Sequence, residues 1–498
     1  MELVIFFTVF FAFAFTVYKA KLFKLTEVPV ILLILLVSLK FGAGQVINKY
    51  YFDRYENQQH SDIYKYFEDG HELYKIALEN PKVYFKIFSG LYESDPSTAK
   101  YVNRLSNWKT HTDNYLKTMN YKDSNPFNSN RAMARINSLF CFISQGYIPT
   151  QTLIFSFLSF LGIILVYLTF LSNLRLPNWL SFVALCCSPS LLIWTSSIQK
   201  ESLMMLGIGL FSYAVFRKQK NYLLILPASL LLLYISYFNL LLLFLAWSLV
   251  LVYQKSFKWF FISICGGLAS FFLMASISSF NPMDPIASRF NLQNKIGKGG
   301  FYLESVNNGN MVYFEHDDFK KISQTLNTKK ENNLTYFELP KQTQVFDYKD
   351  GVSRVVKRNL ENDQGWYYQK LHYTPAKSYV LHRMIEPDAI SFISHFACAI
   401  ENTMTIPYYK LSIITVPFFL ESLILYALAA LFFVLNFNNI KSYYSSDNVF
   451  LLLFAFFSIL LIGYSTPIVG NIIRHKTIAM LFLIMLVMRI GFQSTSKK

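Results

Sequence analysis

The sequence predicts an all-α polytopic membrane protein with about eleven transmembrane helices and two large extracytoplasmic loops. Three observations support this class. Hydrophobic residues make up 53% of the 498 positions and charged residues only 15%, which is too apolar for a soluble enzyme of this length. Several apolar runs approach the roughly 17 to 25 residues needed to cross a hydrocarbon core. Two long polar stretches, about residues 48–150 and 281–408, interrupt these runs.

The apolar runs define the expected organisation. The clearest spans are 153–171, 259–277 and 411–435, whereas 3–18 is slightly short and 28–47 contains Lys40 and Gln45. The first run has no basic leader and no small-residue cleavage pattern, so we interpret it as a retained span rather than a signal peptide. The predicted units are two spans in 1–47, a loop with amphipathic helices in 48–150, a helical bundle in 151–280, a second loop or small subdomain in 281–408, and C-terminal spans in 409–498.

The distribution of lysine and arginine predicts the orientation of the spans. One set of short loops is basic, at 19–24, 173–177, 217–221, 254–258 and 438–447. Basic short loops face the cytoplasm. The two large loops and the turns at 196–202 and 465–476 are then extracytoplasmic, and the expected location is a bacterial inner membrane.

Composition argues against two other classes of protein. The net charge of +16 is not concentrated in a basic stripe with interleaved aromatic residues, so no nucleic-acid partner is expected. The five cysteines include no CxxC pair, and most lie inside apolar runs. Neither a disulfide scaffold nor a zinc site built on cysteine is therefore expected.

An acidic and aromatic cluster opens the first loop. Asp62, Tyr66 and Asp69 are spaced i, i+4 and i+7, which places them on one face of a helix. A carboxylate near an apolar surface can have a raised pKa and act as a general base, or it can hold a divalent cation. The two carboxylates would lie roughly 10 Å apart along the helix, so a catalytic partner would have to come from elsewhere. A solvated helix face would show the same spacing.

A polar turn at 196–202 separates two apolar segments. Ser196 and Gln199 fit a capping box that would start the next helix. Lys200 lies on the predicted outer side, where short loops are otherwise poor in basic residues, so its ammonium group could bind a lipid phosphate.

A second basic group, Arg474, His475 and Lys476, lies at the outer entrance to the last span. An arginine offers a bidentate fork to phosphate and a lysine a point charge, so this trio suits an anionic ligand. Snorkelling at the membrane interface is the alternative. Arg131 and Arg135, at the start of a segment expected to be an interfacial amphipathic helix or a re-entrant one, could join a phosphate site.

These features together resemble the GT-C superfamily of polytopic glycosyltransferases, which use polyprenyl-phosphate-linked sugars. The resemblance implies that Asp62 or Asp69 acts as general base or lies near a metal ion, and that Lys200, Arg474 and Lys476 bind the donor phosphate. Tyr66 and His475 are further substrate-binding candidates, because they belong to the same helix face and the same basic group. The acidic loop follows the second predicted span rather than the first, which departs from the family pattern.

The resemblance also implies the partners. These are a polyprenyl-phosphate-linked sugar, a glycan or protein acceptor and the membrane lipids, and a divalent cation is the one cofactor that would fit. Two alternatives remain. A polysaccharide polymerase or ligase would use undecaprenyl-pyrophosphate glycans and depend on arginines, and Arg289 and Gly300 fit an R-x10-G spacing. The other alternative is a non-enzymatic transporter or envelope assembly subunit.

Overall fold

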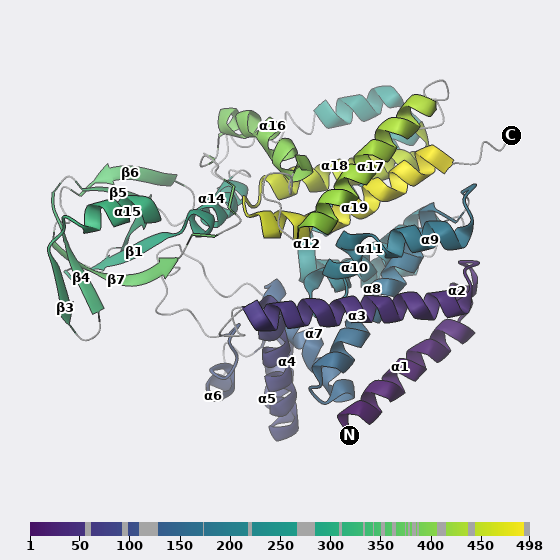
Figure 1. Cartoon of the computed structure of the whole chain (residues 1–498), viewed down its shortest axis with the longest axis horizontal. Coiled ribbons are helices and arrows are strands. Elements are labelled where there is room, and N and C mark those ends of the chain that lie inside the picture. The colour runs from purple at the N-terminus through teal and green to yellow at the C-terminus, as the bar shows by residue number, and fades with distance from the viewer. Residues whose placement is uncertain are drawn as a thin grey trace.

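The computed structural model describes most of the chain (Figure 1). The described residues are 1–54, 61–91, 98–108, 128–172, 174–217, 222–265, 284–307, 311–331, 334–341, 343–349, 354–360, 365–373, 375–376, 379–380, 385, 388–405, 415–436 and 444–492. Most of them are helical, and a separate sheet lies at one end of the molecule.

Seven helices in the described ranges are long and apolar enough to cross a membrane, which supports an integral membrane protein. They are α1 (Glu2–Lys19), α3 (Val30–Arg54), α8 (Ile148–Phe170), α12 (Ile225–Lys255, with the preceding turn Tyr222–Leu224), α17 (Val416–Leu435), α18 (Ser446–Gly463) and α19 (Val469–Phe492). The predicted count of eleven is not supported. That count included the predicted span 259–277, most of which lies outside the described residues. It also included shorter apolar segments, which form α9 (Asn178–Cys186), α10 (Pro189–Trp194) and α11 (Lys200–Phe216).

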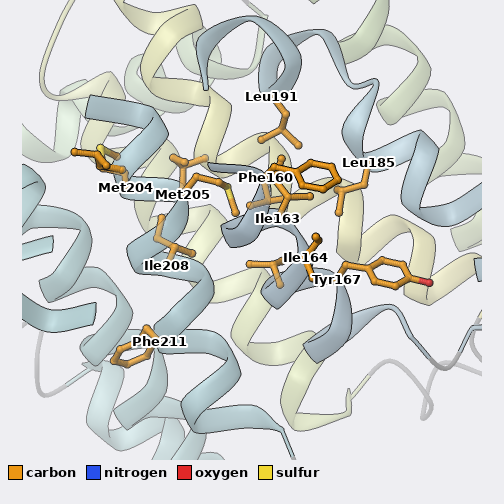
Figure 2. Close-up of a cluster of buried hydrophobic side chains, with 14 of the residues drawn as sticks. Phe160, Ile163, Ile164, Tyr167, Leu185, Leu191, Met204, Met205, Ile208 and Phe211 are labelled. Atoms are coloured by element: carbon orange, nitrogen blue, oxygen red, sulfur yellow. The ribbon is translucent and has the colours of Figure 1, made fainter. Parts of the chain in front are cut away.

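Helix α8 is the centre of the bundle. Its residues Phe160, Ile163 and Tyr167 are almost fully buried and belong to the same hydrophobic cluster as Met205 and Phe211 of α11, and in Figure 2 Met205 lies toward Phe160 and Ile163. Two glycines allow the backbones to touch: a Cβ added at Gly209 would lie 2.5 Å from the carbonyl oxygen of Gly162. This close approach fixes α11, and therefore its first residues, relative to α8.

Helix α12 folds back on itself at Ser236, which has non-helical backbone angles (φ −161°, ψ 81°). Leu232, before the fold, lies against Gly207 of α11. Trp247, after the fold, contacts Phe211 of the same helix, with ring centroids 6.0 Å apart. Both halves of α12 therefore pack along α11.

The described part of the first polar stretch is mostly helical. It contains α4 (Asp62–Glu79), α5 (Pro81–Ser89), α6 (Ala99–Val102) and α7 (Ser129–Ser144). Helices α4 and α7 pack closely, because a Cβ added at Gly70 would lie 2.5 Å from Cβ of Asn137. Helix α7 covers most of the segment predicted as an amphipathic helix, and it ends at Gln145 in the left-handed conformation (φ 51°).

The second polar stretch, expected to be a loop or a small subdomain, contains a sheet and is not helical throughout. A seven-stranded antiparallel sheet has the order β3-β4-β7-β1-β2-β5-β6. The strands are β1 (Gly300–Ser305), β2 (Met311–Glu315), β3 (Thr328–Glu331), β4 (Leu334–Leu339), β5 (Gln344–Lys349), β6 (Arg354–Asn359) and β7 (Gly365–Tyr373). Helix α15 (His316–Ser323) packs on the sheet, α14 (Asp284–Lys298) lies between the sheet and the helical bundle, and α16 (Ala389–Thr405) packs against α18. This sheet is an addition to the predicted all-helical class.

Candidate functional site

A cavity of about 450 Å³ lies at one end of the helical bundle, where elements from the whole length of the chain meet. Its wall contains four of the predicted site residues, Asp62, Lys200, Arg474 and His475. The other polar or charged lining residues include Ser129, Asn130, Glu201, Asn239, Gln293 and Asn471. Apolar side chains such as Met204, Phe238 and Ile478 complete the wall.

Three helices begin at this cavity. Helix α4 starts at Asp62, α7 at Ser129 and α11 at Lys200, and all three residues line the space. The first turn of a helix has unpaired N–H groups and carries about half a positive charge. The arrangement therefore favours a negatively charged ligand, such as a phosphate, and also favours acidic side chains at the same positions.

Arg474 of α19 is held by two carboxylates. Its Nε donates to Oε1 of Glu201 at 2.7 Å and its Nη2 donates to Oε2 at 3.0 Å, a bidentate pair. Its Nη1 donates to Oδ2 of Asp62 at 3.0 Å. Glu201 is buried, with a side chain 2% exposed, whereas the Asp62 side chain is 51% exposed. A guanidinium group has five N–H donors, so two remain for a ligand in the cavity.

Lys200 lies beside a buried tyrosine. Its Nζ donates to Ser129 Oγ at 2.8 Å and to Asn130 Oδ1 at 2.6 Å. Tyr66 donates its hydroxyl to the same Asn130 oxygen at 2.8 Å, and its ring lies 5.5 Å from the Lys200 ammonium. Burial and the charge of Asp62 hold the pKa of Tyr66 well above its usual value, so the phenol remains a donor. Tyr66 is therefore a support for Lys200 rather than part of the cavity wall.

The charges around Asp62 make it an ionised carboxylate. Partial burial opposes ionisation, but Arg474 and Lys200 outweigh it and hold the pKa of Asp62 below its usual value. The sequence argument expected a raised pKa, because it considered an apolar surface and not the cationic partners. Asp62 is thus ionised and can accept hydrogen bonds, although its lowered pKa makes it a weaker base than an ordinary carboxylate. It contacts Arg474 directly, and Lys200 lines the same cavity.

Asp69 does not reach the cavity, although it shares the helix face with Asp62. Its carboxylate is buried and accepts four hydrogen bonds, from the backbone N–H and side chain of Ser106 and of Asn107, at 2.6 to 3.0 Å. These bonds tie the segment after α6 to α4. Asp69 lies about two helical turns from Asp62, its oxygens accept these four hydrogen bonds, and it does not line the cavity, so this position does not support its predicted catalytic role.

Lys476 also lies apart from Arg474. It is buried, and its Nζ is 3.3 Å from the Met404 carbonyl oxygen and 3.2 Å from the hydroxyl of Tyr426. Two positions along a helix turn the side chain by roughly 200°. The prediction that Lys476 shares an anion site with Arg474 is therefore not supported. His475 does line the cavity, with Nδ1 3.8 Å from Glu201 Oε1.

The turn before Lys200 is a buried structural element. Helix α11 begins at Lys200 after Gln199, and no side-chain capping bond is formed, so the predicted capping box is wrong. Instead, Ser156 Oγ donates to the Ser196 carbonyl oxygen at 2.7 Å, and Lys40 donates to Ser196 Oγ at 3.1 Å. Lys40 also donates to the Leu191 carbonyl oxygen at 3.1 Å. The lysine that interrupted an apolar run thus stabilises the turn that positions Lys200.

Arg131 and Arg135 belong to the packing of the first loop. Both guanidinium groups lie 5.6 Å from the ring of Trp108, and Arg131 Nε donates to the Asn107 carbonyl oxygen at 3.1 Å. Neither residue lines the cavity. Their expected role in a phosphate site is not supported by this position.

Sequence reasoning missed two parts of the site. Glu201 was not singled out, although a charged pair at the start of an apolar segment, Lys200 and Glu201, was a signal for it. The second missed part is the interruption of α12 at Ser236. The residues around this interruption, Tyr234 to Asn239, form part of the cavity wall. No sequence spacing relates these residues to Arg474.

The cavity combines two basic groups, an ionised carboxylate and an apolar wall. Within the described ranges, no three His, Cys, Asp or Glu side chains are grouped so that they could hold a metal ion. The two cavity carboxylates are both engaged by Arg474. Such a site can bind an anion and accept a proton from a neighbouring hydroxyl. The chain matches no family model, no curated protein and no solved structure.

Proposed function

We propose that the protein is a membrane glycosyltransferase that moves a sugar from a polyprenyl-phosphate donor to an acceptor on the extracytoplasmic face. The observation that carries the proposal is the meeting of Asp62, Lys200 and Arg474 in one cavity at the end of an apolar bundle. A lipid-linked phosphate needs both an anion site and an apolar neighbourhood, and this cavity offers both.

In the proposed reaction, the phosphate of the donor lies against Lys200, the two remaining N–H groups of Arg474 and the helix N-termini. The acceptor hydroxyl oxygen attacks the anomeric carbon of the sugar, and its proton passes to the Asp62 carboxylate. The bond between the anomeric carbon and the phosphate oxygen breaks, and polyprenyl phosphate leaves with the electron pair. The fixed positive groups stabilise the negative charge that develops on the leaving phosphate.

Glu201 has a positioning role in this proposal. Its bidentate contact holds Arg474 in one orientation, and its side chain is almost fully buried. Because Glu201 balances part of the charge of Arg474, the site does not need a permanent counter-ion when no donor is bound.

The test compares lipid-linked glycans in cells that carry the wild-type protein, a deletion, Asp62→Asn or Lys200→Met. We expect lipid-linked sugar to accumulate in the deletion and in both variants. The matched controls are Asp53→Asn, a carboxylate with a 58% exposed side chain outside the cavity, and Lys65→Met on α4. Accumulation in the deletion but normal glycans in both cavity variants would reject this site, and normal glycans in the deletion would reject the function.

A transporter is the second candidate, because one specific feature favours it. Interrupted helices are typical of transporter binding sites, and the interruption of α12 at Ser236 lines the cavity. Movement of labelled lipid-linked sugar across proteoliposomes without formation of a glycan product would favour this candidate. The polymerase alternative depends on Arg289, which belongs to α14 and whose side chain lies outside the described part of the structure.

A further inference from the structure

A pair of histidines lies at the seven-stranded sheet, His372 in β7 and His316 at the start of α15, and neither lines the first cavity. Strand β1 lies between β7 and β2, and Phe301 of β1 is paired with His372 of β7. His316 directly follows β2, whose Phe314 is paired with the same Phe301. The strand register therefore brings together two histidines that are 56 positions apart in the chain.

The two imidazole rings are close and held in place by an aromatic neighbour. Nε2 of His372 is 3.3 Å from Nδ1 of His316, and the ring planes differ by 19°. The Phe301 ring stacks on His372, with centroids 4.1 Å apart, and lies 5.5 Å from His316. Packing against Phe301 limits the rotation of both imidazoles, so the two nitrogens face each other before any ligand arrives.

This separation suits a shared metal ion. Zinc binds histidine nitrogens at about 2.0 to 2.1 Å in a tetrahedral arrangement, which places two such nitrogens roughly 3.3 Å apart. Neutral imidazole is the form that binds metal.

A cavity next to the pair leaves room for further ligands. It has a volume of about 370 Å³, and its wall includes His316, Lys320, Gln369 and three phenylalanine rings. In the described ranges, no third His, Cys, Asp or Glu completes a cluster here. A metal ion at the pair would then have two protein ligands, and water or a bound molecule in the cavity would fill its other positions.

We propose that His316 Nδ1 and His372 Nε2 bind one divalent transition-metal ion, of the kind represented by Zn²⁺ or Cu²⁺, beside the cavity whose wall includes His316. Each imidazole keeps its single proton on the nitrogen that faces away, Nε2 of His316 and Nδ1 of His372. Binding therefore shifts the tautomer of one ring and requires no net change in protonation. The proposal does not depend on the glycosyltransferase function.

The test is a Zn²⁺ titration of the full-length protein, purified in detergent and stripped of metal with a chelator. We expect saturation at one Zn²⁺ per chain. His316→Gln and His372→Gln keep a polar side chain of similar length but remove a ligand, so each should weaken binding by roughly 10-fold or more. His71→Gln on α4 is the matched control and should bind Zn²⁺ like the wild-type protein, because His71 stacks on Tyr74 rather than on another histidine.

A Cu²⁺-loaded wild-type sample gives a second readout that does not rely on variants. Its electron paramagnetic resonance spectrum should show coupling to two histidine nitrogens. Absence of saturable Zn²⁺ binding, unchanged binding in both glutamine variants, or coupling to fewer than two nitrogens would each show that the histidines form only a hydrogen-bonded pair.

Discussion

Arg474 and Asp62 form an ion pair with a 3.0 Å contact although they are 412 positions apart in the chain. One residue starts the first helix of an early polar loop, and the other lies in the first turns of the last helix. Glu201 joins them through its bidentate contact with Arg474. This three-residue group is the centre of the candidate site, and four predictions follow from it and its supports.

The two carboxylates of α4 should respond differently to removal of their charge. Asp62→Asn should abolish transfer and leave the fold intact, because the side chain is half exposed and touches Arg474 only through its own oxygens. Asp69→Asn should instead lower stability by about 1 to 3 kcal/mol, since a buried acceptor of four hydrogen bonds loses its charge. Transfer rates at low temperature and thermal unfolding in detergent measure the two effects. Loss of transfer in a stably folded Asp69→Asn protein would contradict the assignment.

Removal of Arg474 should cost both activity and stability. Arg474→Ala leaves the buried Glu201 carboxylate without its partner, which typically costs about 3 to 5 kcal/mol. Adding Glu201→Gln removes the uncompensated charge, so the double variant should recover much of the stability but no transfer. Chemical unfolding and a transfer assay on both variants separate the structural part from the functional part. Recovery of transfer in the double variant would mean that Arg474 does not bind substrate.

The ion pair of Asp62 predicts a pH dependence at the acidic end. The pKa of Asp62 in the folded chain is below its unfolded value of about 3.9. Its carboxylate therefore stabilises the fold above about pH 4, and this contribution is lost as the pH falls through the folded-state pKa. Melting temperatures from pH 6 to pH 3 should fall less steeply for Asp62→Asn than for the wild-type protein. Equal slopes for the two proteins would show that the pair adds no pH-dependent stability, and Asp53→Asn serves as the exposed control.

Two glycines of α3 provide a matched test of the packing beneath Lys200. A Cβ added at Gly44 would lie 2.0 Å from the Ser196 carbonyl oxygen, whereas Gly42 has nothing within 4 Å. Gly44→Ala should destabilise the protein by about 1 to 3 kcal/mol and disturb the turn that leads to Lys200. Gly42→Ala should be neutral or stabilise by up to about 1 kcal/mol, since alanine favours a helix. Equal thermal stability of the two variants would show that the close contact between α3 and this turn does not limit the side chain at position 44.

The sequence by itself determined the class of protein and the residues worth testing. Long apolar runs require a membrane, and helical spacing placed Asp62 and Tyr66 on one face, because both properties depend only on neighbours along the chain. Basic groups at segment ends, Lys200 and Arg474, were visible for the same reason. The number of crossing helices was not determined, since short apolar segments such as α9 and α10 cannot be distinguished from spans by composition.

Only the tertiary structure decided which of these residues act together. Helical spacing made Asp62 and Asp69 equally good candidates for a catalytic carboxylate. In the structure, the Asp69 carboxylate accepts hydrogen bonds from residues 106 and 107, whereas the Asp62 carboxylate contacts Arg474. In the same way, packing turns Lys476 toward Tyr426 and leaves His475 at the cavity. The sheet of the second loop pairs strands far apart in sequence, so it too depended on long-range contacts. The physical reason is the same in all these cases. Contacts between distant segments depend on how helices and strands pack, and local sequence patterns do not predict that packing.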